Sequence, residues 1–199
     1  MRYFSSMQGI LYEITKTPPG GDAKDIRFSG GKRKELTTML YQTDFNTLAQ
    51  QYMDMVYRIA LNSLRNPADA EDVTQNVFFR LYRSKPSFET DAHAKHWLIR
   101  VAINESKRLL AAPWRSNETG LKEIAAPLQD LTQQHRALFY QVMELPVKYR
   151  IPLYLYYYEG YSVREIGELL HRRPSTVQTQ LARGREKLKE FIMEEGGSL

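Results

Sequence analysis

Residues 145–188 constrain the fold of this 199-residue chain more than any other stretch. Leu145-Pro146 opens a first short helix. Glu159-Gly160 closes it, because glycine most easily takes the left-handed conformation at a helix end. Ser162–Glu165 has the spacing of a capping box and begins a second helix. Pro174 suits the first position of a third helix, where its missing N–H is not needed. These helix-start and helix-end signals therefore predict three helices connected by two short turns.

The second and third helices are amphipathic. The residues expected to point inward are Val163, Ile166, Leu169, Leu170, Val177, Leu181 and Leu188, and those expected to point outward are Ser175, Gln178, Thr179 and Arg183. A short helix, a turn and a second amphipathic helix are typical of a helix-turn-helix, although many helical bundles contain the same pair without binding DNA. The outer face is basic, and the Gln-Thr-Gln run at 178–180 offers groups suited to base edges. Arg172, Arg173 and Arg183 suit phosphates. These side chains favour DNA binding.

A family resemblance covers this whole stretch. The run LPVKYRIPLYLYYYEGYSVREIGELL, followed by PSTVQTQLARGREKLKE, resembles the carboxy-terminal domain, region 4, of bacterial sigma factors of the extracytoplasmic-function group. In that family this domain reads the minus-thirty-five promoter element. The resemblance implies that the residues facing this element are Arg172, Arg173, Ser175, Gln178, Thr179 and Arg183. Four positions depart from the family pattern: His171 replaces a frequent glycine, Arg173 a frequent capping serine, and Gln178 and Gln180 frequent basic residues.

Residues 44–83 read as two further helices. The first has an apolar stripe and ends near Arg65, and the second begins with Asn66 as N-cap and Pro67 as first residue. Residues outside the second helix's buried stripe are Asp72, Gln75, Asn76 and Arg80, and composition alone favours an ordinary solvated face. The run NPADAEDVTQNVFFRLYR, however, resembles the sigma region 2 helix that docks on the coiled coil of the polymerase's largest subunit. The resemblance implies that these four residues bind polymerase.

A long helix is expected from about residue 92 to 110, after a loop at 85–91. The run SFETDAHAKHWLIRVAIN resembles the sigma segment that opens the minus-ten element and holds a flipped base. On that resemblance, the residues that contact this DNA are Phe88, His96, Arg100, Asn104 and Lys107. Trp97 is expected to pack in the core. His93 and His96 lie three apart, but no third ligand has a convincing spacing, so we expect no metal site.

Bulk properties limit the possible functions. The chain carries a formal net charge of +5, contains no cysteine and has no apolar run long enough to span a membrane. We expect a soluble, cytoplasmic protein without disulfides or thiolate metal sites.

Pro152 falls inside the helix expected at 147–158, so that helix either starts late, near Arg150, or kinks. Its four tyrosines, at 154 and 156–158, are expected to form in part an exposed aromatic patch.

Two small helical domains on a flexible linker account for these patterns. The predicted fold is all-α, with a sigma region 2 bundle at 44–110, a linker at 111–129 and a region 4 helix-turn-helix domain at 130–195. Residues 1–38 read as a weakly ordered extension, and Met39 is a candidate start of the chain.

The leading hypothesis is a sigma factor that directs core RNA polymerase to specific promoters and initiates transcription. It implies core polymerase, promoter DNA and an inhibitory anti-sigma factor as partners, no cofactor, no insertion of the chain in the membrane and no catalysis by the chain itself. The alternative is a stand-alone helix-turn-helix regulator that binds duplex DNA without polymerase. A nuclease using Asp69, Asp72 and a metal is disfavoured, because these acids lie where a helix start favours negative charge.

Overall fold

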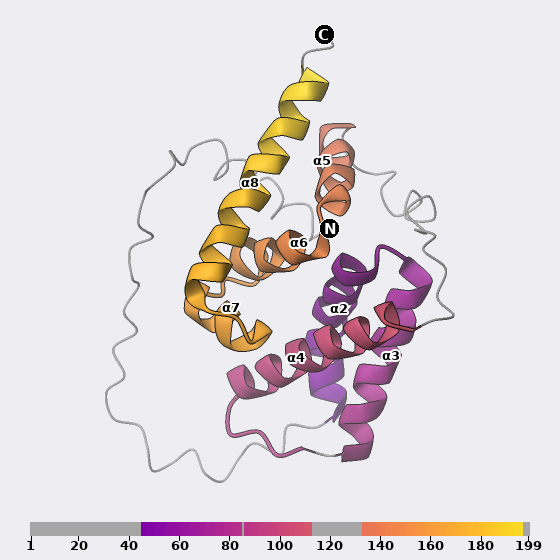
Figure 1. Cartoon of the computed structure of the whole chain (residues 1–199). Helices are drawn as coiled ribbons and strands as arrows, with labels where there is room; N and C mark the ends of the chain where they lie inside the picture. The colour runs from indigo at the N-terminus through magenta and orange to yellow at the C-terminus, as the bar shows by residue number, and fades with distance from the viewer. Residues whose placement is uncertain (1–44, 85, 113–132, 197–199) are drawn as a thin grey trace.

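The computed structural model describes residues 45–84, 86–112 and 133–196, and every regular element in these ranges is helical (Figure 1). The elements are α2 (Phe45–Leu64), α3 (Pro67–Ser84), α4 (Asp91–Leu110), α5 (Gln133–Glu144), α6 (Val147–Leu153), the π-helix η2 (Tyr154–Tyr158), α7 (Val163–Leu170) and α8 (Pro174–Gly196). The predicted all-α fold is confirmed. The expectations for residues 1–38, for Met39 and for most of the linker lie outside the described residues.

The first bundle consists of α2, α3 and α4, which all contact one another. Its core contains the predicted stripes, including Val56, Val77 and Leu98. The side chain of Asn66 accepts a hydrogen bond from the amide of Asp69 at 3.1 Å, as expected for an N-cap. Thr90 caps α4 in the same way, so that helix begins one residue earlier than predicted.

The second bundle consists of α5, α6, η2, α7 and α8, with the long α8 packed on α5, α6 and α7. Val177, Leu181 and Leu188 point into its core as predicted. Gly184 lies where α8 meets α6, and a Cβ atom there would come within 2.8 Å of Leu153 Cδ1. The absence of a side chain at Gly184 therefore allows these two helices to approach closely.

Pro152 lies in the second turn of α6 rather than at a late helix start. The helix begins at Val147, and regular α-helical turns end at Leu153. The next five residues form a π-helix, in which the amide of Glu159 donates to the carbonyl of Tyr154 at 3.3 Å. An internal proline removes a backbone donor, and a wider turn directly after it accommodates the loss. The late-start alternative was wrong, and the irregularity follows the proline.

The expectation of an exposed aromatic patch was also wrong. Tyr154 is buried and stacks on Tyr158 with ring centroids 5.0 Å apart, while Tyr156 and Tyr157 are half-buried. The guanidinium of Arg58, in the first bundle, lies 4.9 Å over the Tyr158 ring. Both bundles cover the tyrosines, since Arg185 of α8 in their own bundle donates to the Tyr157 hydroxyl at 3.3 Å.

The two bundles meet along two pairs of helices. α6 packs beside the C-terminal end of α2, and α7 packs beside the first turns of α4 (Figure 1). Among the helices that the structure describes, none is long and apolar enough to cross a membrane.

Candidate functional site

The turn between α7 and α8 is built from local hydrogen bonds and one close approach. Ser162 and Glu165 form the predicted capping box, and these hydrogen bonds from Ser162 lower the pKa of the Glu165 carboxyl. His171 has a left-handed backbone with φ of 54°, which ends α7. The amide of Arg172 donates to the carbonyl of Gly167 at 2.8 Å, and a Cβ at Gly167 would lie 2.8 Å from the Arg172 carbonyl oxygen. Glycine is therefore required at position 167 for this turn.

The structure brings together all six residues predicted to face the minus-thirty-five element. They lie on the first turns of α8 and on the turn before it, and all are exposed: Arg172, Arg173, Ser175, Gln178, Thr179 and Arg183. The Thr179 hydroxyl donates to the Ser175 carbonyl at 2.9 Å, so only its lone pairs remain for a ligand. Gln180 is 7% exposed, and the expectation that it supplies a base-contacting group was wrong because it lies on the core side of α8.

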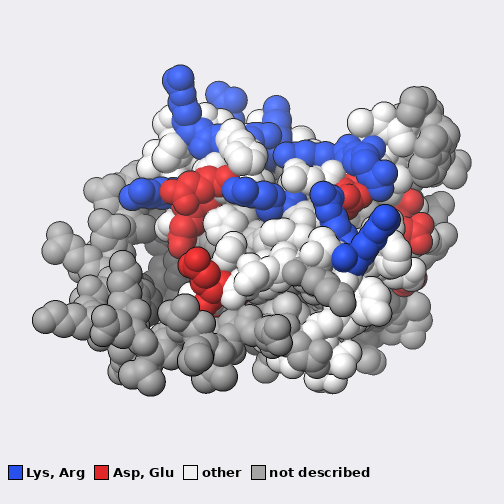
Figure 2. All heavy atoms as spheres, turned by 90° about the horizontal axis from the view of Figure 1, so that it is seen from below, with Lys and Arg blue, Asp and Glu red and all other residues white. Residues whose placement is uncertain are grey.

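Basic side chains surround the start of α8. Arg164, His171, Arg172 and Arg173 line a hollow at the helix-turn-helix joint, with Glu168 as its acidic member. Figure 2 shows Lys and Arg side chains spread over much of the described surface on this side, with a band of Asp and Glu among them. The positive end of the α8 dipole adds to this charge. The hollow can attract a phosphate group.

The five residues predicted for the minus-ten element separate into two sets. Arg100, Asn104 and Lys107 are exposed on successive turns of α4. His96 is half-buried against α7, with its ring centroid 6.2 Å from that of Tyr161 and with Nε2 unpartnered within the described residues. Burial and nearby Arg100 lower the pKa of His96.

Phe88 belongs to the core of the first bundle. It is 5% exposed, and its ring makes edge contacts with Trp97 and His93 at centroid distances of 5.8 and 5.5 Å. Trp97 is half-buried and packs on the core, as expected. The Phe88 ring offers no free face for a base in this arrangement.

The four residues predicted to bind polymerase share the outer side of α3. Asp72, Gln75, Asn76 and Arg80 are all exposed. The guanidinium of Arg80 lies 3.2 Å from the Glu105 carboxylate of α4, so this residue also joins two helices of the bundle.

The sequence did not predict a groove that lies between α2 and α3. It has a volume of about 790 Å³ and includes Met53, Tyr57, Glu71 and Gln75 among its lining residues. Met53 on α2 is half-exposed, and Phe79 and Tyr82 on α3 are more exposed still. The available signal for the groove was Met53, an apolar residue of α2 outside its buried stripe; Phe79 and Tyr82 do not line the groove.

Metal binding has no support from the arrangement of side chains. In the part of the chain that the structure describes, no three His, Asp or Glu residues are grouped so as to hold a metal ion.

Comparison with known families matches both bundles. The family model "Sigma-70 region 2" matches residues 48–116, and the model "Sigma-70, region 4" matches residues 135–188. The two matches fall on the first and second bundles respectively.

Similar curated proteins indicate which group of sigma factors the chain resembles. The ECF RNA polymerase sigma factor SigW of Bacillus subtilis is 29% identical over 174 residues, which cover 76% of this chain and 90% of the relative. The chain belongs to the extracytoplasmic-function sigma factors. The sigma factor SigM of Mycobacterium tuberculosis is 27% identical, with 88% of this chain and 93% of SigM covered. The sigma-E factor of Escherichia coli K12 is 29% identical, with 76% of this chain and 87% of the relative covered.

A solved structure shares the fold of this sigma factor. The sigma factor RpoE of Bartonella quintana, solved in complex with the anti-sigma factor NepR, has a TM-score of 0.56 and 18% identity. The alignment covers 75% of this chain and 97% of that one.

Proposed function

We propose that this chain is a promoter-specificity subunit that directs core RNA polymerase to particular promoters and has no catalytic activity of its own. The observation that carries the proposal is the exposed face of α8, where amide, hydroxyl and guanidinium groups lie together. This helix is the second of a helix-turn-helix whose first helix, α7, begins with a complete capping box. Gln178, Thr179 and Arg183 would contact base edges of the minus-thirty-five element, and Arg172 and Arg173 would contact its phosphates.

The outer side of α3 is the proposed polymerase contact. Asp72, Gln75 and Asn76 present acidic and amide groups there, and Gln75 also lines the α2–α3 groove. An apolar groove with a polar rim is typical of a protein-binding surface, because apolar burial supplies affinity and polar groups fix the register. Binding to core polymerase would also place the chain in the cytoplasm.

The proposed minus-ten contact lies on α4. Arg100, Asn104 and Lys107 form a polar and basic face that suits an unpaired DNA strand. His96 and Phe88 can join this contact only after a rearrangement, because His96 packs on the second bundle and Phe88 packs on Trp97.

An anti-sigma factor is a further proposed partner. The Bartonella quintana sigma factor with the same fold was solved bound to one. We extend that type of partner to this chain on family membership alone.

The alternative is a helix-turn-helix regulator that acts without polymerase. The two proposals differ in what binds DNA, so the test measures retention of genomic DNA fragments by the chain alone and by the chain with core polymerase. A sigma factor should retain a small specific set of fragments only with core polymerase. Tight sequence-specific retention by the chain alone would favour the stand-alone regulator.

A further inference from the structure

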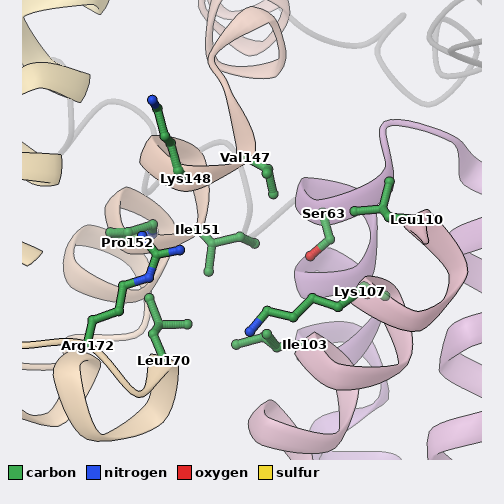
Figure 3. Close-up of a pocket in the computed structure, with 11 residues that line it drawn as sticks. Ser63, Ile103, Lys107, Leu110, Val147, Lys148, Ile151, Pro152, Leu170 and Arg172 are labelled. Atoms are coloured by element: carbon green, nitrogen blue, oxygen red, sulfur yellow. The ribbon is translucent and has the colours of Figure 1, made fainter. Parts of the chain in front are cut away.

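A cavity of about 100 Å³ lies between the two bundles. Its lining comes from the ends of α2 and α4 in the first bundle and from α6, the end of α7 and the α7–α8 turn in the second (Figure 3). Apolar and basic side chains both contribute to it, and none of the described residues that line it is acidic. The proposed function uses only Lys107 and Arg172 from this lining and assigns no ligand to the space itself.

The walls of the cavity are apolar, and part of that apolar surface is exposed. Leu110 of α4 is 41% exposed and Val147 of α6 is 40% exposed, and both line the cavity from opposite bundles. The buried side chains of Ile103, Ile151 and Leu170 continue the apolar surface inward. An alkyl group placed here removes exposed apolar surface of both bundles from water, which favours its binding.

Two cations face the same space. Figure 3 shows the side chains of Lys107, from the first bundle, and Arg172, from the second, directed into the gap from opposite walls, whereas the Lys148 ammonium points away from it. Lys107 and Arg172 are exposed, and neither forms an ion pair within the part of the chain that the structure describes. Like charges that face one gap repel each other, so an anion held between them lowers the electrostatic energy.

The serine hydroxyls at the cavity do not add donors for this anion. Ser63 Oγ and Ser106 Oγ each donate at 2.8 Å to a backbone carbonyl of their own helix. Because these protons are already used, the charged end of a ligand has Lys107 and Arg172 as its donors, and its apolar end has the alkyl walls.

The size of the cavity limits the ligand. One water molecule needs about 10 to 15 Å³ of such a space, so this cavity accommodates roughly seven to ten non-hydrogen atoms. A folded partner is too large for it, and an inorganic anion leaves the apolar walls uncovered. The cavity therefore fits a small molecule that has both a charged and an apolar part.

We propose that this cavity binds a small amphipathic anion, with a carboxylate or phosphate head held by Lys107 and Arg172 and a short alkyl body against Ile103, Ile151 and Leu170. Binding to the chain alone does not depend on the proposed function. Its consequence does rest on that function, because the bound anion occupies two side chains that are proposed to contact DNA phosphates.

Calorimetric titration of the full chain tests the two parts of the ligand separately. Octanoate and hexyl phosphate carry both parts, octan-1-ol carries only the apolar body, and inorganic phosphate carries only the charge. The tighter of the two amphipathic anions should bind at least about fivefold more strongly than octan-1-ol and than inorganic phosphate, because charge-assisted hydrogen bonds and alkyl burial both contribute. That anion also identifies the preferred head group. A smaller ratio, or no binding of either anion, would overturn the proposal.

Substitution of the two cations tests the head-group contacts. Lys107→Gln with Arg172→Gln changes exposed positions and should weaken binding of the tighter anion at least about tenfold, while binding of octan-1-ol stays within about twofold. Lys148→Gln with Lys189→Gln is the matched control, since it removes the same charge from side chains that do not point into the gap or lie on α8 away from it, and should leave anion binding unchanged. Equal losses in the two double variants would attribute binding to overall charge and contradict the proposal.

Methyl NMR of the full chain locates the bound anion. Methyl signals of Ile103, Val147 and Leu170 should shift during titration with octanoate, whereas the Met53 signal, in the α2–α3 groove, should not. A Met53 shift as large as those at the cavity would indicate non-specific association of an amphipathic molecule and would count against this site. The measurement needs neither polymerase nor DNA, so its failure leaves the proposed function untouched, and failure of transcription leaves this site untouched.

Discussion

At the residue scale, His171 is the position where the local backbone and the side chain conflict most clearly. Its φ of 54° is a left-handed conformation that glycine adopts at little cost and other residues adopt at about 1 to 2 kcal/mol. The sequence comparison marked this position, because the family often has glycine there. The turn keeps its geometry with histidine, so the surrounding packing bears that cost.

His171→Gly should stabilise the chain by a net amount of about 0.5 kcal/mol, since relief of the left-handed strain exceeds the added flexibility of the unfolded chain. The midpoint of thermal unfolding should rise by about 1 to 2 °C. Gly160→Ala is the matched control. Its φ is 74° and no atom lies near the added Cβ, so the change should lower the midpoint through backbone strain alone. A lower midpoint for His171→Gly would contradict this explanation.

His96 predicts a pH dependence of stability. Burial and Arg100 lower its pKa in the folded chain, while Glu165 and Glu168 of α7 partly oppose that shift and His93 adds to it. Between the lowered pKa and the ordinary value of about 6.5, the unfolded chain binds more protons than the folded one. Stability should therefore rise with pH through this window and level off above it.

Urea unfolding at a series of pH values from about 5 to 8 checks this dependence. The midpoint of unfolding should increase as the pH approaches the ordinary histidine pKa, and His96→Gln should flatten that part of the curve. A midpoint that falls as the pH rises through the window in the unmodified chain would show that His96 is not held neutral by burial.

At the element scale, the residues proposed to bind polymerase lie on α3 of the first bundle, and those proposed to read DNA lie on α8 of the second. Substitutions on the two helices should therefore separate polymerase binding from promoter selectivity. Asp72→Ala with Gln75→Ala should weaken binding to core polymerase at least tenfold, because we place both side chains among the few interface residues whose truncation costs more than about 1 kcal/mol. Promoter preference of the complexes that still form should not change. Equilibrium binding of labelled chain to core polymerase provides the measurement.

Gln178→Ala with Arg183→Ala should have the opposite effect. Loss of a good base contact costs about 1 to 3 kcal/mol of discrimination, so promoter selectivity should fall about tenfold or more while polymerase binding is retained. Glu186→Ala, at an exposed position farther along α8, is the control and should affect neither activity. If the α8 variant lost polymerase binding and the α3 variant lost selectivity, the roles of the two bundles would have been exchanged.

At the scale of the whole molecule, local signals predicted the helices well and long-range packing poorly. Asn66, Ser162 and Pro174 act within one or two turns of their own helices, so their sequence neighbours suffice to place α3, α7 and α8. The burial of Phe88 depends on Trp97, and Tyr158 is covered by Arg58 of the other bundle. Arg150 gave no local sign that its side chain donates to the carbonyl of Asn62, because that partner lies far away in the sequence.

The same distinction applies to the candidate site. Helical periodicity separates exposed from buried residues on α3 and α8, and the expected base contact failed for Gln180 because that residue lies on the core side of α8. Helical periodicity cannot show which polar face of a helix is covered by packing against another bundle. For that reason His96 and Lys107 were assigned to DNA without any sign that His96 packs on the second bundle and that Lys107 lines a cavity between the bundles.

The most direct test of the central claim is run-off transcription on genomic DNA with core polymerase, with and without this chain. The account predicts a small set of new start sites that appear only when the chain is present and that decrease with the α8 variant Gln178→Ala, Arg183→Ala. The same start sites with core polymerase alone, or no new start sites when the chain is added, would contradict it.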